Sequence, residues 1–201
     1  VEAFGQKSYN GVANITKNSS SDTKKGIRGF DDPQTRVIST THEDIRVVNV
    51  YVPNGQSVGS DKFEYKLSWL DHLKKMLRND LKKHSKMVIL GDFNIAPRDE
   101  DVHDPEKWRD KILCSAQERT MFEEILSMGF HDSFRLFEKG AGFHSWWDYR
   151  TAAYTKELGL RIDLLLVSDE LKPLCKKSYI DEKPRWLEKP SDHTPVVVEL
   201  G

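Results

Sequence analysis

Residues 45 to 90 contain a strand, a helix and a second strand in succession, and this order constrains the fold more than any other feature. Ile45 to Tyr51 is a β-branched run, and residues 61 to 84 carry apolar side chains at helical spacing. Met87 to Leu90 is a short apolar run with the length and composition of a buried strand. We therefore predict an α/β (α+β type) fold, in which strands form antiparallel meanders and crossovers and helices lie outside.

Local patterns predict the remaining elements. Ser115 and Glu118 form a capping-box pattern at the start of a second helix, which Gly129 ends. The segment from residue 37 to 41 is expected to pair with residues 45 to 51 as a hairpin. Further strands are expected at residues 12 to 16, 161 to 167 and 195 to 200, whereas the polar residues 17 to 35 are expected to form a loop.

The composition excludes several classes of protein. The 201 residues fit a single domain, residues 1 to 201, and no apolar run approaches the roughly 18 residues of a membrane span. The two cysteines form neither a disulfide framework nor a zinc cluster, and they favour a reducing, cytoplasmic environment. Because the formal net charge is -1, binding to nucleic acid would need a local basic patch.

Gly91-Asp92-Phe93-Asn94 directly follows the apolar run that ends at Leu90. If strand alternation continues, the Asp92 carboxylate and the Asn94 amide leave the backbone on the same side. A carboxylate can take a proton from water or hold a metal, and an amide can orient the attacking oxygen, so the pair suits hydrolysis of a polar bond. The alternative is an ordinary turn, since Gly, Asp and Asn are all common turn residues.

Two further acidic positions are candidates. Asp163 lies inside the apolar run from residue 162 to 167, and a buried carboxylate is costly without a partner, so we expect a histidine or an arginine beside it. An ion pair to Arg161 is the alternative. Asp192-His193 precedes the last strand between flanking prolines, where it suits either a metal-plus-acid/base pair or an ordinary cap.

Aromatic residues gather in Trp146-Trp147-Asp148-Tyr149-Arg150. Flat rings stack on bases or sugars and arginine pairs with phosphate, but a packed aromatic corner explains the segment equally well. Tyr51 ends a strand and can offer its hydroxyl to a phosphate oxygen or simply pack at the rim of the core. The other six histidines show no metal-ligand spacing and are expected at the surface.

Five segments together resemble exonuclease III and its relatives, the bacterial AP endonucleases of the endonuclease/exonuclease/phosphatase superfamily. The segments stand in the family's order from about residue 5 to the C-terminus: Val50-Tyr51-Val52-Pro53-Asn54-Gly55, Leu90-Gly91-Asp92-Phe93-Asn94-Ile95-Ala96-Pro97, Trp146-Trp147-Asp148-Tyr149-Arg150, Gly159-Leu160-Arg161-Ile162-Asp163 and Pro190-Ser191-Asp192-His193-Thr194-Pro195. Asp-Phe-Asn and Ser-Asp-His are shared with phosphoinositide phosphatases, sphingomyelinases and DNase I. The aromatic-Arg and Leu-Arg-Ile-Asp segments are similar to the DNA-repair branch.

The resemblance implies a DNase I-like four-layer α/β sandwich, in which two packed mixed sheets are flanked by helices and the site lies at one rim. It implies that Asp92 activates the water and that Asn94 positions the water and the phosphate. His193 would contact the phosphate, Asp163 would orient His193, and Tyr51 would bind the scissile phosphate. The metal would be Mg²⁺, with Mn²⁺ as an alternative, on Asp192, Asp92 and Asn94.

The resemblance also implies DNA contacts. Trp146, Leu160 and Ile162 match an apolar pocket for an extrahelical abasic sugar. Lys7 and Tyr9 match a loop that touches the DNA backbone and minor groove. The full set of implied DNA-binding residues is Lys7, Tyr9, Asn10, Asn54, Trp146, Trp147, Arg150, Leu160 and Ile162.

The sequence departs from the family's pattern at its start. The pattern begins with a strand carrying an Asn and continues with a strand ending in Gln-Glu, whose Glu is another main Mg²⁺ ligand. The sequence begins at Val1, after both. We therefore expect an N-terminally incomplete domain, with weak Mg²⁺ affinity and little or no activity from the 201 residues alone.

The expected function is Mg²⁺-dependent hydrolysis of phosphodiester bonds in double-stranded DNA during base excision repair. The reactions would be 3′→5′ exonuclease trimming and incision at abasic sites, by a monomeric bacterial protein acting in the cytoplasm on the nucleoid and not at a membrane. The rival hypotheses are a superfamily phosphoesterase that acts on lipid or inositol phosphates and a catalytically impaired DNA-binding fragment.

Overall fold

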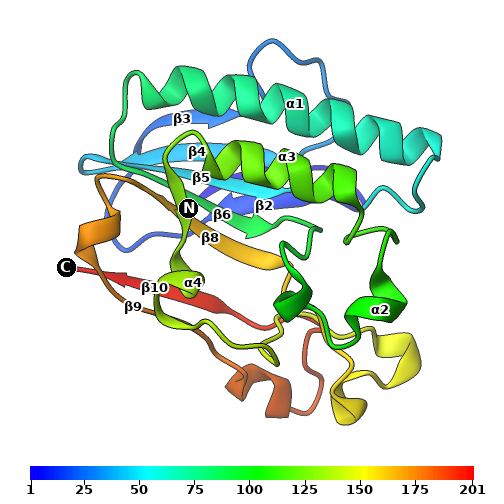
Figure 1. Cartoon of the computed structure of the whole chain (residues 1–201). Coiled ribbons are helices and arrows are strands. Elements are labelled where there is room, and N and C mark those ends of the chain that lie inside the picture. Colours follow the sequence, from blue (N-terminus) through cyan, green and yellow to red (C-terminus); the bar gives the residue numbers. More distant parts are fainter.

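A mixed sheet of six strands forms the centre of the molecule (Figure 1). A computed structural model describes all 201 residues. In order across the sheet, the strands are β3 (Ser21–Lys25), β4 (Val37–His42), β5 (Ile45–Tyr51), β6 (Met87–Asp92), β8 (Asp163–Ser168) and β7 (Phe130–Asp132). β5 and β6 are parallel, and every other neighbouring pair is antiparallel.

Two helices cover one face of this sheet. Helix α1 (Asp61–Leu81) connects the parallel strands β5 and β6, and α3 (Ala116–Leu126) lies beside it (Figure 1). The Ser60 side chain caps α1 by accepting a hydrogen bond from the Phe63 N–H, and the predicted capping box of Ser115 and Glu118 is confirmed at α3. The larger core cluster lies between these helices and the sheet and includes Trp69, Leu70 and Ile89.

The opposite face carries two separate two-stranded sheets. β1 (Glu2–Gly5) pairs with β2 (Gly11–Asn14), and β9 (Cys175–Ile180) pairs with β10 (Val196–Leu200). β2 lies against β4 and β5, whereas β10 lies against β8, where its apolar side chains pack on Leu165 and Val167. The α/β class with mixed sheets and flanking helices is confirmed, but the second layer consists of two pieces and is not one continuous sheet.

Short helices and turns complete the chain: α2 (Pro105–Trp108), α4 (Ser133–Phe137) and 3-10 turns at Asp99–Asp101, Tyr149–Thr151, Tyr154–Lys156, Lys172–Leu174 and Lys183–Trp186. The predicted loop from residue 17 to 35 is wrong in part, because it contains β3. β3 is a charged edge strand without apolar alternation, so its sequence resembles that of a loop. None of the helices has the length and apolar character that crossing a membrane would require.

Candidate active site

Three candidate residues lie together at the ends of three inner strands of the six-stranded sheet, which form one edge of the sheet perpendicular to the strands. Tyr51 ends β5 and is in register with Asp92, the last residue of β6. On its other side Asp92 is in register with Asp163, the first residue of β8. The sheet therefore places a phenol and two carboxylates on neighbouring strands at the same edge.

Gly91 allows β6 to approach β5 immediately before Asp92. Its φ is +131°, and a Cβ atom built there would lie 1.9 Å from the carbonyl oxygen of Val50. Every other residue type would collide with backbone, so only glycine fits this position. The close pairing of the two strands thus fixes where Asp92 stands.

Asn94 holds the Asp92 carboxylate from beyond the end of β6. Its backbone N–H donates to Asp92 Oδ1 at 2.8 Å, and its side-chain Nδ2 donates to Asp92 Oδ2 at 3.0 Å. Asn94 has φ +48°, so the two residues meet through an Asx-type turn and not through strand alternation, as the sequence argument assumed. The Asn94 Oδ1 atom accepts a hydrogen bond of 3.0 Å from Asn54 Nδ2.

His193 is the partner that the buried Asp163 requires. The distances from His193 Nδ1 to Asp163 Oδ1 and Oδ2 are 3.0 and 2.9 Å. The alternative ion pair between Asp163 and Arg161 is not formed, because the Arg161 guanidinium bonds to Asp101 and Asp132. Of the two histidine nitrogens, Nε2 is therefore free to face a substrate.

Ser145 orients Asp163 from behind and was missed at the sequence level. Its hydroxyl donates to Asp163 Oδ2 at 2.7 Å and accepts the backbone N–H groups of Ile162 and Asp163 at 3.0 and 2.9 Å. The Ser145 carbonyl also accepts the Thr194 N–H at 2.8 Å, which ties this loop to the His193 segment. The only feature of the sequence that singles out Ser145 is its position directly before Trp146, and a single serine there does not indicate a contact with Asp163.

Burial and neighbouring charges shift the pKa values of Asp92 and His193. Burial, followed by the Asp163 charge, raises the pKa of Asp92 to about 7, although His193 and the Asn94 N–H oppose the shift. Burial lowers the pKa of His193, but its hydrogen bond to Asp163 and the surrounding carboxylates outweigh burial and raise the pKa to about 9. The site therefore combines a protonated imidazole with a carboxyl group that titrates near neutrality.

The oxygen donors at this edge suit a hard divalent cation. Asp92 and Asp192 supply carboxylates and Asn94 supplies an amide oxygen, although the chain contains no group of three or more His, Cys, Asp or Glu side chains placed to hold a metal. Mg²⁺ usually binds through one or two carboxylates, with water and substrate phosphate completing its octahedron. Burial is the main cause of the raised pKa of Asp92 and the neighbouring Asp163 charge adds to it, so a cation bound beside these carboxylates would offset both effects, and the donor set fits such an ion.

Tyr51 is held by Arg36, which no sequence motif had indicated. The Arg36 guanidinium lies 4.6 Å from the centre of the Tyr51 ring, and Arg36 Nη1 donates to the Tyr51 carbonyl at 3.0 Å. The Tyr51 residue is half-buried, so it occupies the rim of the core and not its interior. Arg36 thus brings a cation to the same edge as Asp92.

The two adjacent tryptophans have different environments. Trp146 is half-buried, its Nε1 donates to Asp192 Oδ2 at 3.1 Å, and its ring lies 6.5 Å from that of His193. Trp147 is buried between His144, Tyr154 and the Arg185 guanidinium. This environment matches the packed aromatic corner that was the alternative for this segment, and it leaves little of the Trp147 ring exposed for a contact with DNA, which stays a prediction.

The predicted abasic-sugar pocket is closed. Leu160 and Ile162 are 0% and 2% exposed in a small core cluster, so of the three predicted pocket residues only Trp146 reaches solvent. The two aliphatic residues cannot contact a ligand in this conformation. The Arg150 side chain is exposed, and the backbone N–H of Arg150 donates to Asp148 Oδ1 at 2.9 Å.

Most of the remaining predicted DNA contacts line an open groove of about 820 Å³ between the β1–β2 loop and the β5–α1 loop. Tyr9, Asn10 and Asn54 line this groove, and Tyr9 is 90% exposed. Lys7 is exposed on the same loop. The prediction that all the other histidines lie at the surface is wrong for His144, which is buried against Trp147.

Comparisons with known proteins agree with this geometry. The profile of the Endonuclease/Exonuclease/phosphatase family matches residues 2–193. An exodeoxyribonuclease III from Haemophilus influenzae is 34% identical, and the match covers 98% of this chain and 78% of that protein.

Solved structures give the same result. A 3′-5′ exonuclease (NExo) from Neisseria meningitidis is 45% identical, with a TM-score of 0.95 over 99% of this chain and 79% of that one. An AP endonuclease from Archaeoglobus fulgidus is 35% identical, with a TM-score of 0.94 over 99% of this chain and 78% of that one. The resemblance drawn from the motifs is confirmed.

Proposed function

Because the chain belongs to the endonuclease/exonuclease/phosphatase family, we propose that it is a DNA-repair nuclease that hydrolyses phosphodiester bonds. The observation that carries the proposal is the arrangement at the sheet edge, where the His193–Asp163 pair lies beside the Asp92–Asn94 pair. This arrangement combines a proton acceptor with a cationic hydrogen-bond donor, the two groups that hydrolysis of a phosphate ester needs.

In the proposed reaction, a water molecule attacks the phosphorus in line with the leaving oxygen. Asp92 accepts the proton of the water, a role that suits a carboxyl group with a pKa near 7, and Asn94 fixes the Asp92 oxygens. The protonated His193, held by Asp163, faces the phosphate and stabilises its growing negative charge. The Tyr51 hydroxyl adds a hydrogen bond to a phosphate oxygen.

A divalent cation, specifically Mg²⁺, is part of the proposal. Asp92, Asn94 and Asp192 would hold it, and when bound it supplies positive charge that offsets the charge developing on the phosphate. The oxygen donors of these side chains and the second carboxylate, Asp163, beside Asp92 support this assignment.

The proposed substrate is double-stranded DNA with 3′ ends or abasic sites. The groove lined by Tyr9, Asn10 and Asn54 would receive the backbone, and the exposed Arg150 would pair with a phosphate. The exposed part of Trp146 would contact an abasic sugar, since such a sugar is easily unstacked. We also propose that the protein is a monomer and that it acts on DNA in the cytoplasm.

A substrate panel tests the proposal. The 201-residue chain is incubated with an abasic duplex, a duplex with a recessed 3′ end, and a soluble inositol phosphate, each with Mg²⁺ and with EDTA. The expected result is slow, Mg²⁺-dependent cleavage of the two DNA substrates, because the sequence predicts weak Mg²⁺ affinity for these 201 residues alone. Release of phosphate from the inositol substrate alone would favour a different phosphoesterase, and DNA binding without cleavage at any Mg²⁺ concentration would favour a binding module.

A further inference from the structure

Lys66 is a fully buried cation in the middle of the molecule. Its side chain on α1 is 0% exposed, and its ammonium group donates to the carbonyl oxygens of Asn94 at 2.6 Å and of Asn54 at 3.2 Å. Its third acceptor is the Glu118 carboxylate at the start of α3. An ammonium group has three N–H donors, so this set satisfies all of them.

Glu118 is itself held rigidly. Its carboxylate accepts the Ser115 hydroxyl at 2.6 Å and the backbone N–H groups of Ser115 and Leu113 at 3.0 and 3.1 Å. These hydrogen bonds fix the position of the carboxylate that pairs with Lys66. The fixed carboxylate places the Lys66 ammonium group between the loop that contains Asn54 and the loop that contains Asn94.

Those two loops carry residues of the candidate site. Asn94 has φ +48°, which turns its carbonyl inward to Lys66 while its N–H and its amide hold Asp92. Asn54 offers its carbonyl to the same ammonium group and its side-chain Nδ2 to Asn94 Oδ1. A non-glycine residue in the left-handed region is strained and needs surrounding contacts to keep it there.

We propose that Lys66, fixed by Glu118, is a positioning residue that keeps Asn94 in its left-handed conformation and thereby sets the orientation of the Asp92 carboxylate. The inference rests on the proposed function, because it assigns Lys66 to the same reaction. Stability alone does not account for the pair, since an apolar pair of similar volume usually stabilises a core as well as a buried ion pair does. An apolar pair would, however, leave the carbonyl oxygens of Asn54 and Asn94 without a hydrogen-bond donor.

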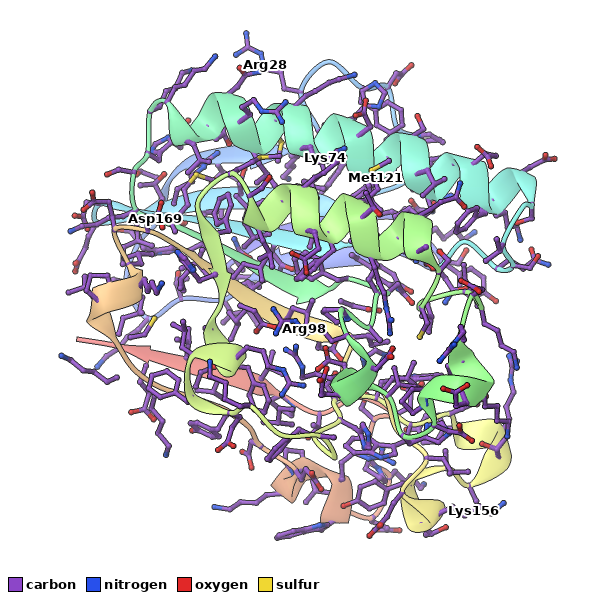
Figure 2. All side chains as sticks on the ribbon, in the orientation of Figure 1. Arg28, Lys74, Arg98, Met121, Lys156 and Asp169 are labelled. Carbon is purple, nitrogen blue, oxygen red and sulfur yellow. The ribbon has the colours of Figure 1, made fainter.

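A second ion pair between the same helices provides a matched control. Lys74 lies two turns after Lys66 on α1, and its ammonium group bonds to Glu124 on α3. Figure 2 labels Lys74 between the two helices. Lys74 is also largely buried, but it bonds to no carbonyl of a site loop. The two pairs therefore share helices and chemistry but differ in their contact with Asn54 and Asn94 and in the exposure of the acid, since Glu124 is half exposed and Glu118 is not.

The test compares Lys66→Met/Glu118→Gln with Lys74→Met/Glu124→Gln. Both changes are double so that no carboxylate is left without its counter-ion. The free energy of unfolding is measured in urea, and kcat and KM are measured on the abasic duplex and on the recessed 3′ end with Mg²⁺. We expect the Lys66 variant to lose roughly hundredfold in kcat with KM nearly unchanged, as a displaced catalytic group does. The Lys74 variant should keep the kcat of the starting protein.

A Lys66 variant whose kcat matches that of the Lys74 variant would overturn the inference. A spectroscopic readout keeps it testable when the starting protein cleaves none of the substrates, which would be a failure of the proposed function alone. The side-chain amide signals of Asn94 in ¹⁵N-labelled protein should then shift and exchange faster in the Lys66 variant only. Unchanged Asn94 signals in that variant would show that Lys66 does not position Asn94.

Discussion

Arg161 and Asp163 are two residues apart, yet they belong to two clusters of charged side chains, one with equal numbers of acids and cations and one with more acids than cations. In the paired cluster, Asp101 and Asp132 face the guanidinium groups of Arg161 and Arg135; Arg161 Nε lies 2.6 Å from Asp101 Oδ1 and Arg161 Nη2 lies 2.6 Å from Asp132 Oδ2. In the catalytic cluster, the carboxylates of Asp92 and Asp163 face one imidazole, that of His193.

The difference in balance has a direct electrostatic consequence. Burial raises the pKa of Asp101, but the two arginines outweigh burial and hold it below its usual value. Burial and the Asp163 charge instead raise the pKa of Asp92 to about 7. A carboxylate that is fully compensated contributes to stability, whereas one that lacks a cation is available for protons, metals and substrate.

Asp92→Asn should have the largest effect on the catalytic cluster. The amide cannot accept a proton from water, so cleavage of the abasic duplex should fall by about 10²–10⁴-fold. DNA binding, measured by fluorescence anisotropy, should stay close to that of the starting protein. Lost binding would instead mark Asp92 as a structural residue and would remove the contrast between the clusters.

Arg161→Met should have the largest effect on the paired cluster. It leaves Asp101 and Asp132 buried with a single guanidinium, and breaking a buried pair costs about 3–5 kcal/mol. Urea unfolding at pH 7 measures this loss. A change near zero would show that the paired cluster contributes no more to stability than the catalytic one.

Asp163→Asn should lower the pKa of His193 from about 9 towards its ordinary value of 6.5, as followed by ¹H–¹⁵N NMR in metal-free protein. The folded pKa of His193 lies above the unfolded one, so the pair stabilises the fold fully below pH 6.5 and loses this contribution as pH rises through 9. Asp101 has a lowered pKa and loses its contribution on the acid side, as pH falls below 3.8. An unchanged His193 titration in the variant would contradict the pairing.

Trp146→Ala should reduce incision of the abasic duplex more than trimming of a recessed 3′ end. The excess loss should be about tenfold, which corresponds to about 1.4 kcal/mol of transition-state stabilisation. Trp147→Ala serves as the control, since its buried ring should affect unfolding in urea and not the choice of substrate. Equal losses on both substrates would contradict the sugar contact of Trp146.

Arg150→Ala should have the smallest effect, because the side chain is exposed and bonds to no other side chain. Removing one phosphate contact should weaken binding to all duplexes alike and reduce the salt slope of log Kd by about 1. An unchanged slope would show that Arg150 lies outside the DNA-contacting surface.

Local signals were sufficient wherever neighbouring residues decide the structure. The capping box at Ser115 depends on a residue three positions away, and the strand–helix–strand order of residues 45 to 90 depends on periodicity, so both were predictable. The burial of Asp163 required a partner and limited its type, but only the fold selects His193 over Arg161, because Arg161 bonds to side chains from two distant segments.

Other features depend on long-range packing and left no pattern to detect. Ser145 reaches Asp163 across 18 positions, and Lys66 reaches Glu118 across 52. Adjacent aromatic residues give no signal of which ring faces outward, so Trp146 and Trp147 were treated alike although only Trp147 is buried. β3 carries charged residues at a sheet edge, where burial imposes no alternation.

Gly91 has a consequence for how mutations at this site are interpreted. Any side chain there would push the Val50 carbonyl away and separate β6 from β5, one residue before Asp92. In a saturation mutagenesis screen scored by DNA cleavage, positions 91 and 92 would both tolerate no substitution. Scoring cellular abundance alongside cleavage would separate them, since changes at Gly91 deplete folded protein whereas Asp92→Asn leaves a folded protein that does not turn over.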